Sequence, residues 1–297
     1  MRPERALAGR YTRPYAITGA VVLVRAADAG RFAATAALDQ PTVHLVVNRG
    51  GHLERVVRAH FPHALIEPID DNRALPRRVL DGSADAAVSD SAEARAWIGP
   101  DLRVLGPLTH DYKAILLPPN DGELAARVGT WLEQREQDGW LAHRRERWLG
   151  TPDPSSAAAA QREAIAAFIR LRSDLMPAVA AAKRAAGLPV VDPEQEARVL
   201  ARAAALARRS PAQVEALYRL LIEMAKSVQE QSPVPDSATL LDLRAAIARI
   251  DEALIAEMNR PLSGTSSDWQ IVLDRALDLP GVDAGARQRL AAVLSRQ

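Results

Sequence analysis

The stretch KRAAGLPVVDPEQEARVL, Lys183–Leu200, contains the end of one helix and the start of another. A glycine and a proline in its first half interrupt the first helix, because both residues disfavour a continued helical backbone. Asp192 followed by Pro193 is typical of a helix start, with an N-cap side chain and a preset φ at the first helical position. The stretch therefore predicts two helices joined by a short turn, with Lys183 before the turn and Glu196 after it.

The overall composition excludes several classes of protein. The chain has 297 residues, enough for two domains, and 38 Lys+Arg against 37 Asp+Glu leave almost no net charge. That balance argues against nucleic acid or an anionic membrane as a partner. There is no cysteine for a disulfide or a thiolate, and no apolar run approaches the roughly 18 residues of a membrane helix. The charged N-terminal segment does not resemble a signal peptide.

The pattern of the chain changes near residue 150. Before that point β-branched runs alternate with helical stretches, whereas GTPDPSSAAAA (150–160) is typical of a linker and the rest predicts only helices. The expected fold class is α/β followed by all-α, with divisions at 1–150, 151–160 (the linker) and 161–297. Strands are expected at 20–26, 43–47, 84–90 and 113–118, and helices at 52–61, around Glu93, and at 123–149.

The helix expected at about 158–186 carries Arg172 and Lys183 on its apolar stripe, and Pro177 inside it is expected to kink it or to remove one backbone hydrogen bond. Arg172 and Lys183 are eleven residues apart, about three turns, so they share one face. Two cations on an apolar face are costly unless an anion meets them. In the alternative, both side chains reach solvent at the helix edge. The apolar members of the stripe are Ile165, Phe168, Met176 and Val179.

Two later helices also place polar groups on inward faces. Gln229 lies on the apolar face of the helix expected at 211–231, although a solvated glutamine near a helix end is the alternative. Arg244 lies on the inward face of the helix expected at 238–259, and Asp251 is expected to pair with it or with a neighbouring helix. The apolar residues of these faces are Tyr218, Ile222 and Ala225, and Leu240, Ile247, Leu254 and Met258.

The spacing R-x10-K-x4-LP-x2-D-x3-E, with LLIEMAKSVQ and LRAAIARID, resembles the all-helical chorismate mutases, especially their exported branch. The resemblance covers Gln161–Arg260. It implies the pericyclic conversion of chorismate to prephenate, which needs no cofactor, metal or nucleophile. It assigns the substrate carboxylates to Arg172 and Arg244, and the ether oxygen to Lys183 and Gln229.

The resemblance also implies that Glu196 accepts a hydrogen bond from the ring hydroxyl. Asp192 is a further substrate-binding candidate, although its N-cap role accounts for it fully. Gln195 stands where the family typically has arginine, and Arg198 is a candidate substitute on the same helix. Ala225 stands where the family has serine or threonine.

Four segments of the first half, VVNRGGHLERVVRAHF, SADAAVSDSAEA, THDYKAILLP and WLEQREQDGWLAHRRERWLG, resemble the periplasmic cyclohexadienyl dehydratases. The resemblance implies the two-lobed solute-binding-protein fold, a periplasmic location, and conversion of prephenate or arogenate to phenylpyruvate or phenylalanine. It makes Glu93 the candidate general acid, and a helix N-terminal acid favoured by the helix dipole is the alternative. The substrate-binding candidates are Arg49, Gly50, Gly51, His52, Asp90 and Lys113.

These observations predict a chorismate mutase fused to a dehydratase-like module of phenylalanine biosynthesis, acting on small-molecule substrates; the alternative is a solute receptor with a helical docking domain. The sequence is compatible with a homo-oligomer but does not predict one. The histidines do not have the spacing, with carboxylates nearby, that would indicate a metal site. The opening segment RPERALAGRYTRPY resembles a region deep in the first lobe, so roughly a hundred residues of the usual fold are expected to be missing. Poor prephenate turnover is therefore expected, whereas a fragment from about Ala157 to Gln297 is expected to carry mutase activity.

Overall fold

The computed structural model describes residues 1–231 and 238–296, which form two compact units. The helical unit comprises Met1–Ala16, Tyr112–Ala142 and Pro154–Gln297, and the α/β unit comprises Ile17–Asp111 and His143–Asp153. Strand β2 (Ala16–Thr18) pairs with β8 (Asp111–Lys113), and the boundary between the units runs through both strands. Within the described ranges, no helix has the length and apolar character needed to span a bilayer.

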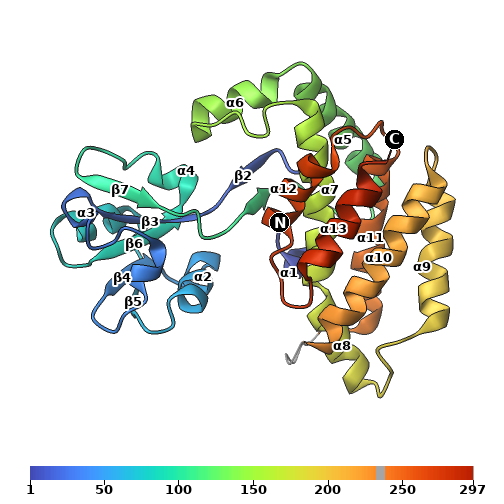
Figure 1. Cartoon of the computed structure of the whole chain (residues 1–297), viewed down its shortest axis with the longest axis horizontal. Coiled ribbons are helices and arrows are strands. Elements are labelled where there is room, and N and C mark those ends of the chain that lie inside the picture. The colour runs from blue at the N-terminus through green and yellow to red at the C-terminus, as the bar shows by residue number, and fades with distance from the viewer. Residues whose placement is uncertain (232–237, 297) are drawn as a thin grey trace. The chain divides into compact units, whose positions relative to one another are not determined.

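A five-stranded mixed sheet forms the centre of the α/β unit (Figure 1). Its central strand β6 runs parallel to β4 and antiparallel to β3, while β5 and β7 form the two edges. The strands are β3 (Ala20–Arg25), β4 (His44–Asn48), β5 (Leu65–Ile69), β6 (Ala86–Asp90) and β7 (Leu102–Leu105).

Both faces of this sheet are covered, because successive residues of the buried strands point to opposite sides. One face packs Val22 and Val47 against helix α2 (His52–His60). The other face packs against α3 (Leu75–Leu80) and α4 (Ser91–Ala94). Continuous apolar runs in the sequence are therefore explained by burial on two sides.

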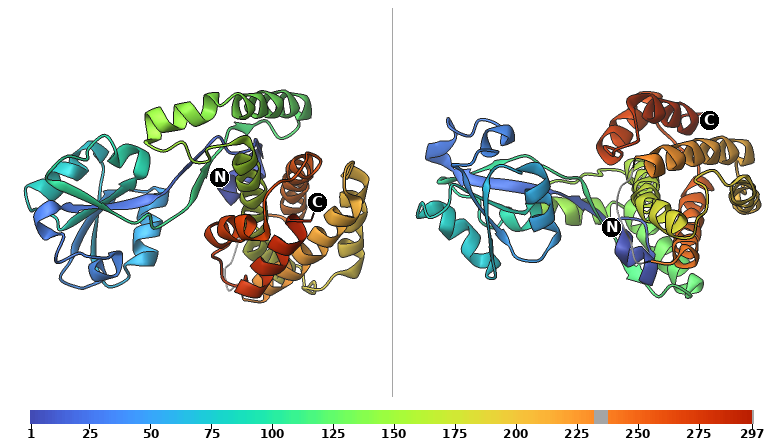
Figure 2. Two further views of the ribbon diagram at one scale, coloured as in Figure 1. Left: turned by 45° about the horizontal axis from the view of Figure 1, so that its top comes forward. Right: turned by 90° about the horizontal axis from the view of Figure 1, so that it is seen from below.

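The helical unit is a bundle in which α7 packs along α11, and α10 contacts α8, α9 and α13 (Figures 1 and 2). Its core holds Phe168, Tyr218, Leu254 and Trp269. The main helices are α7 (Ala157–Asp174), α8 (Met176–Ala185), α9 (Pro193–Leu206), α10 (Pro211–Glu230), α11 (Leu240–Met258), α12 (Ser266–Ala276) and α13 (Ala284–Leu294). Four shorter or earlier elements join them: α1 (Pro3–Ala8), β1 (Arg10–Tyr11), β9 (Leu116–Leu117) and α5 (Gly122–Gln137).

Three expected elements are wrong in their continuity. The kink expected at Pro177 is a full break, so the helix expected at 158–186 is two helices, and Pro177, which has no N–H to donate, lies in the first turn of α8. The helix expected at 123–149 is divided at Gly139, which adopts a φ of 77°, into α5 and α6 (Trp140–Leu149). The strand expected at 113–118 is replaced by the short strands β8 and β9.

The compact units do not follow the division expected at residue 150, because residues 1–16 and 112–142 group with the helical unit. The expected linker, 151–160, is also too long, since α7 begins at Ala157 after the N-cap Ser156. The boundary near residue 150 therefore remains a prediction about sequence resemblance, with dehydratase-like segments before it and mutase-like helices after it.

Buried charges explain why these early segments belong to the helical unit. Glu163 of α7, 2% exposed, accepts hydrogen bonds from the hydroxyl of Tyr112 at 2.9 Å and from Arg275 at 2.6 Å. Glu257 of α11, 4% exposed, pairs with Arg13 at 3.5 Å. A buried carboxylate needs such partners, so Tyr112 and Arg13 complete the packing of α7 and α11.

Candidate active site

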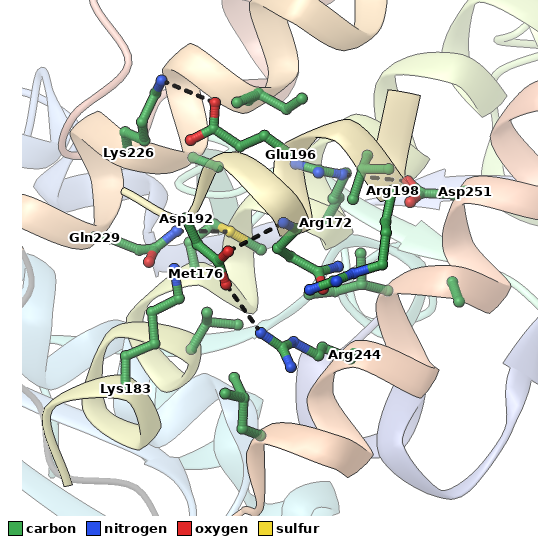
Figure 3. A pocket seen from close by; sticks show the side chains of 18 of the residues that line it. Arg172, Met176, Lys183, Asp192, Glu196, Arg198, Lys226, Gln229, Arg244 and Asp251 are labelled. Atoms are coloured by element: carbon green, nitrogen blue, oxygen red, sulfur yellow. Dashed lines mark hydrogen bonds and ion pairs between the residues drawn. The ribbon is translucent and has the colours of Figure 1, made fainter. Parts of the chain in front are cut away.

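A cavity of about 300 Å³ opens between helices α7 to α11 of the helical unit (Figure 3). Side chains from all five helices and from the turn before α9 line it. The structure brings together here every residue that the sequence predicted for the helical half: Arg172, Lys183, Asp192, Gln195, Glu196, Arg198, Gln229 and Arg244.

Arg172 lies in the last turn of α7 and is buried. Its Nε donates to Oδ1 of Asp251 at 3.2 Å, and its Nη1 donates to the carbonyl of Leu221 at 3.3 Å. The alternative in which Arg172 reaches solvent is therefore wrong. Asp251 pairs with a neighbouring helix and not with Arg244, which settles the choice that the sequence left open. Burial raises the pKa of Asp251, and the nearby Arg172 opposes that rise.

Lys183, on α8, is also buried, at 7% exposure. Its Nζ donates to the carbonyl of Val190 at 2.6 Å, because the chain reverses at Gly187, which has a φ of 66°. Burial lowers the pKa of Lys183 below its ordinary 10.5; Asp192 and Glu196 oppose this shift, and Arg244 adds to it. Lys183 and Arg172 lie on two helices separated by a break, and both line the same cavity.

Gln229, near the end of α10, is 5% exposed, so the solvated alternative is wrong. Its Nε2 lies 3.7 Å from the sulfur of Met176. Its Oε1 is buried and has no hydrogen-bond partner within the described ranges. Because a buried polar atom without a partner is costly, this amide is a strong indication of a site for a ligand.

The outer part of the cavity carries paired charges. Asp192 caps α9 by accepting from the N–H of Gln195 at 3.0 Å, and its other oxygen lies 3.4 Å from Nη2 of Arg244. Asp192 therefore has the N-cap role and a place in the cavity at once. Arg198 donates from Nε to Oε1 of Gln195 at 3.2 Å, and Glu196 pairs with a lysine of α10.

That lysine, Lys226, and Arg202 are cavity residues that the sequence analysis missed. Lys226 lies 3.4 Å from Glu196, and Arg202 pairs with Glu252. Helical spacing could have found Lys226, since it lies four residues after Ile222 on the stripe that includes Gln229. The six cations of the cavity are Arg172, Lys183, Arg198, Arg202, Lys226 and Arg244, and its three carboxylates are Asp192, Glu196 and Asp251, which leaves an excess of three positive charges.

The stripe expected on α11 faces inward. Leu254 and Met258 are buried, as expected. Leu240 and Ile247 line the cavity and are only partly buried, whereas Leu243, Ala246 and Ile250 form the buried face of this part of the helix. Arg244 lies between these two sets, which is why it reaches the cavity with its side chain 37% exposed.

The candidate residues of the α/β unit are engaged in local contacts. Glu93 is exposed and accepts from the hydroxyl of Ser89 at 2.6 Å, and Asp90 accepts from Thr18 at 2.7 Å and caps α4. Glu93 is thus bonded within its own segment, and the turn at Gly50 is bonded to Glu54 of the helix that follows it. The turn at Gly50 and Glu93 follow the carboxyl ends of the parallel neighbours β4 and β6, so they lie at one edge of the sheet, whereas the residues of the helical half line one cavity.

The turn after β4 is also occupied by its own neighbours. The N–H of Gly50, whose φ is 73°, donates to Glu54 at 2.7 Å, and Gly51 is the N-cap of α2. Arg49 donates to Asp70 at 2.7 Å and is exposed, while His52 lies 3.4 Å from Asp111. Lys113 belongs to the other unit, in which β8 ends.

The comparisons with known proteins agree with both resemblances. Residues 163–230 match the sequence profile of the family described as chorismate mutase type II, so the chain carries a chorismate mutase domain. The matched range contains seven of the eight predicted cavity residues, Arg172, Lys183, Asp192, Gln195, Glu196, Arg198 and Gln229, and Arg244 lies beyond it.

The other half of the chain is similar to the cyclohexadienyl dehydratase of Pseudomonas aeruginosa, at 34% identity over 151 residues, 49% of this chain and 56% of the relative. The chain thus spans little more than half of that relative. A solved ancestral cationic amino acid solute-binding protein is 29% identical, with a TM-score of 0.47, over 50% of this chain and 66% of its own. An ancestral cyclohexadienyl dehydratase is 32% identical, with a TM-score of 0.33, over 50% and 64%.

Proposed function

We propose that the helical unit is a chorismate mutase that converts chorismate to prephenate in the cavity between α7 and α11. The observation that supports this most is the convergence of Arg172, Lys183, Gln229 and Arg244, from four helices, on a space of about 300 Å³. A cavity of this size suits a small molecule, and its excess of positive charge suits a dianion.

The reaction itself needs little from the protein but position and charge. In chorismate the ether C–O bond breaks as a new C–C bond forms in one concerted step, with no proton transfer. The enzyme must therefore hold a folded conformer of the substrate and stabilise the charge that develops on the ether oxygen. Arginine forks bind carboxylates in a fixed orientation, which is the role proposed for Arg172 and Arg244.

The ether oxygen is assigned to Lys183 and Gln229, which are both buried donors. In a site shielded from water, a fixed donor stabilises developing negative charge more strongly than water does. The present partners of these donors, the carbonyl of Val190 and the sulfur of Met176, are neutral acceptors that a negatively charged oxygen can replace. Glu196 is proposed to accept from the ring hydroxyl, and Lys226 to hold its carboxylate.

The test is the loss of chorismate absorbance with the purified full chain. We expect saturable turnover well above the uncatalysed rate, without added metal or cofactor. Gln229→Glu is an informative variant, because a carboxylate donates to the ether oxygen only when it is protonated, so its activity should move to acidic pH. A folded chain that leaves chorismate at the uncatalysed rate would refute the mutase assignment.

A second candidate function is a dehydratase activity of the other half, favoured by its 34% identity to the Pseudomonas aeruginosa cyclohexadienyl dehydratase. We propose on this basis that the chain belongs to phenylalanine biosynthesis, that it is related to bifunctional enzymes, and that it acts in the periplasm. Prephenate and arogenate are the candidate substrates. Glu93 is the candidate acid, with Asp90, the turn Arg49–His52 and Lys113 as substrate-binding residues.

Phenylpyruvate formation from prephenate near neutral pH tests this second function. Turnover that falls in Glu93→Gln and persists in Arg73→Ala, a change at an exposed position of the same unit, would support it. A chain that converts chorismate but leaves prephenate unchanged would restrict the proposal to the mutase. A receptor with a docking domain is less well supported, because a docking bundle has no need of a cavity lined by six cations.

A further inference from the structure

The carboxylate of Asp251 has no role in the proposed reaction, yet it lines the cavity. Its side chain is 6% exposed and comes from the middle of α11. A negative charge at this place repels a dianionic substrate, and burying it carries a desolvation cost. Its presence therefore calls for a physical reason beyond packing.

The geometry supplies that reason through Arg172. The Nε of Arg172 donates to Oδ1 of Asp251 at 3.2 Å, and its Nη1 donates to the carbonyl of Leu221 at 3.3 Å. A guanidinium has five N–H donors in one plane, so these two contacts leave donors at the Nη end. The side chain starts on α7 and is fixed by α11 and α10, which are two other walls of the cavity.

We infer that Asp251 is a positioning residue for Arg172, holding the guanidinium by its Nε edge so that the Nη end is presented to a substrate carboxylate. The inference rests on the proposed mutase function. An arginine side chain has many rotamers, and a bound carboxylate gains most from a fork that is already oriented. Without Asp251, the carboxylates of Asp192 and Glu196 in the same cavity would compete for the freed cation.

The surroundings of Asp251 restrict its own movement. Tyr218 is fully buried, and its hydroxyl donates to the backbone carbonyl of Asp251 at 3.4 Å. Leu254, one turn later on α11, is also fully buried. The carboxylate thus extends from a fixed backbone, as a positioning group requires.

The test uses the full chain and the variant Asp251→Asn, which keeps the shape of the side chain and removes its charge. We expect the KM and the Kd for chorismate to rise about tenfold or more, with a smaller fall in kcat, because the loss is in holding a carboxylate and not in the bond-breaking step. Glu223→Gln, an exposed change on α10, is the matched control and should leave both constants unchanged.

A double-mutant cycle separates positioning from a general structural role. In the background of Arg172→Ala, the change Asp251→Asn should raise the Kd no further, because its effect acts only through the arginine. Additive effects in the cycle, or an unchanged KM and Kd in folded Asp251→Asn, would overturn the inference. If Asp251→Asn does not fold, Asp251→Glu keeps the charge and displaces it by one methylene, and it should raise the Kd in the same way.

Binding of chorismate by calorimetry keeps this test apart from the test of function. A wild-type chain that binds chorismate without turnover would refute the mutase activity, and the cycle in Kd would still decide the role of Asp251. A wild-type chain that neither binds nor converts chorismate would overturn both proposals.

Discussion

The candidate residues of the helical unit and those of the α/β unit are similar in type but differ in burial. Arg172 and Lys183 are 5% and 7% exposed and face one cavity. Arg49 and Glu93 are exposed, and the Arg49–Asp70 pair has side chains 56% and 82% exposed. Because water screens exposed charges, the same residue types interact more strongly with a charged substrate in the first setting.

Individual candidate groups of the two regions also differ in the contacts that hold them. Arg172 pairs with Asp251 from another helix, whereas Glu93 is bonded to Ser89 and Gly50 to Glu54, four residues away in each case. Asp90 and His52 do have distant partners, Thr18 and Asp111, so the contrast concerns Glu93 and the turn at Gly50. Long-range contacts fix a side chain relative to the other walls of a site, and local ones do not. This contrast indicates that preorganisation is present in the helical unit.

The largest effect is expected from Lys183→Ala. Removing one preorganised donor to the developing oxyanion costs about 3 kcal/mol, so kcat should fall about a hundredfold or more. The measurement is chorismate turnover at saturating substrate, with circular dichroism to show that the fold is intact. Lys183→Arg keeps a cation and should retain more of the rate. A change confined to KM would mean that Lys183 only binds a carboxylate. Burial would then not be what makes a candidate residue catalytic.

Sequence reasoning found the cavity residues because helical spacing and the family pattern both act along the chain. Arg172 and Gln229 recur at whole helical turns from the apolar residues of their helices, and the proline after Asp192 marks Asp192 as an N-cap. It missed Lys226 and left the partner of Asp251 open between Arg244 and a neighbouring helix, because these contacts depend on which helices face one another. It predicted a kink at Pro177 where the structure has a full break. It missed the placement of residues 112–142, since a buried partner such as Glu163 becomes visible only when the helices are packed.

The second effect is a change in stability, and it tests why residues 112–142 belong to the helical unit. Tyr112→Phe removes the hydroxyl that donates to buried Glu163 at 2.9 Å. Burial and Glu163 raise the pKa of Tyr112 well above its ordinary value, so the phenol keeps the proton that it donates. A hydrogen bond to a buried charge contributes about 2 kcal/mol. Urea unfolding of the full chain should show a loss of this order.

Tyr11→Phe is the control for this change, because the Tyr11 hydroxyl is only partly buried and bonds only neutral groups. It donates to the carbonyl of Arg2 at 3.3 Å and accepts from the N–H of Arg2 at 3.0 Å. Tyr11→Phe should cost clearly less than Tyr112→Phe. Equal losses in the two variants would mean that the early segment contributes no buried partner to α7, and the compact helical unit would need another explanation.

The third effect is the alkaline limit of mutase activity. Burial lowers the pKa of Lys183 below 10.5, so its cation is lost at a lower pH than that of an ordinary lysine. As pH rises through that lowered pKa, kcat/KM should fall about tenfold per pH unit, because this constant reports the free enzyme. A bound dianion favours the cation, so the fall in kcat should come at higher pH. In Lys183→Arg the fall should disappear from this range; an unchanged profile would assign it to another group.

The smallest effect is expected in the exposed region, and it tests the other side of the contrast. Arg49→Ala removes a guanidinium that donates to Asp70 and to the carbonyl of Pro68, both at 2.7 Å. Exposed pairs contribute less than about 1 kcal/mol, so the free energy of unfolding should change by no more than that. Chorismate turnover should stay at the wild-type value, since Arg49 lies in the α/β unit and the cavity is lined by the helical unit alone. The two measurements are urea unfolding and the absorbance assay in 0.05 M and 0.5 M salt, a range that weakens exposed pairs but leaves buried ones largely intact. A loss of mutase rate in Arg49→Ala would show that the two regions are coupled, and burial alone would then not explain which of them is active.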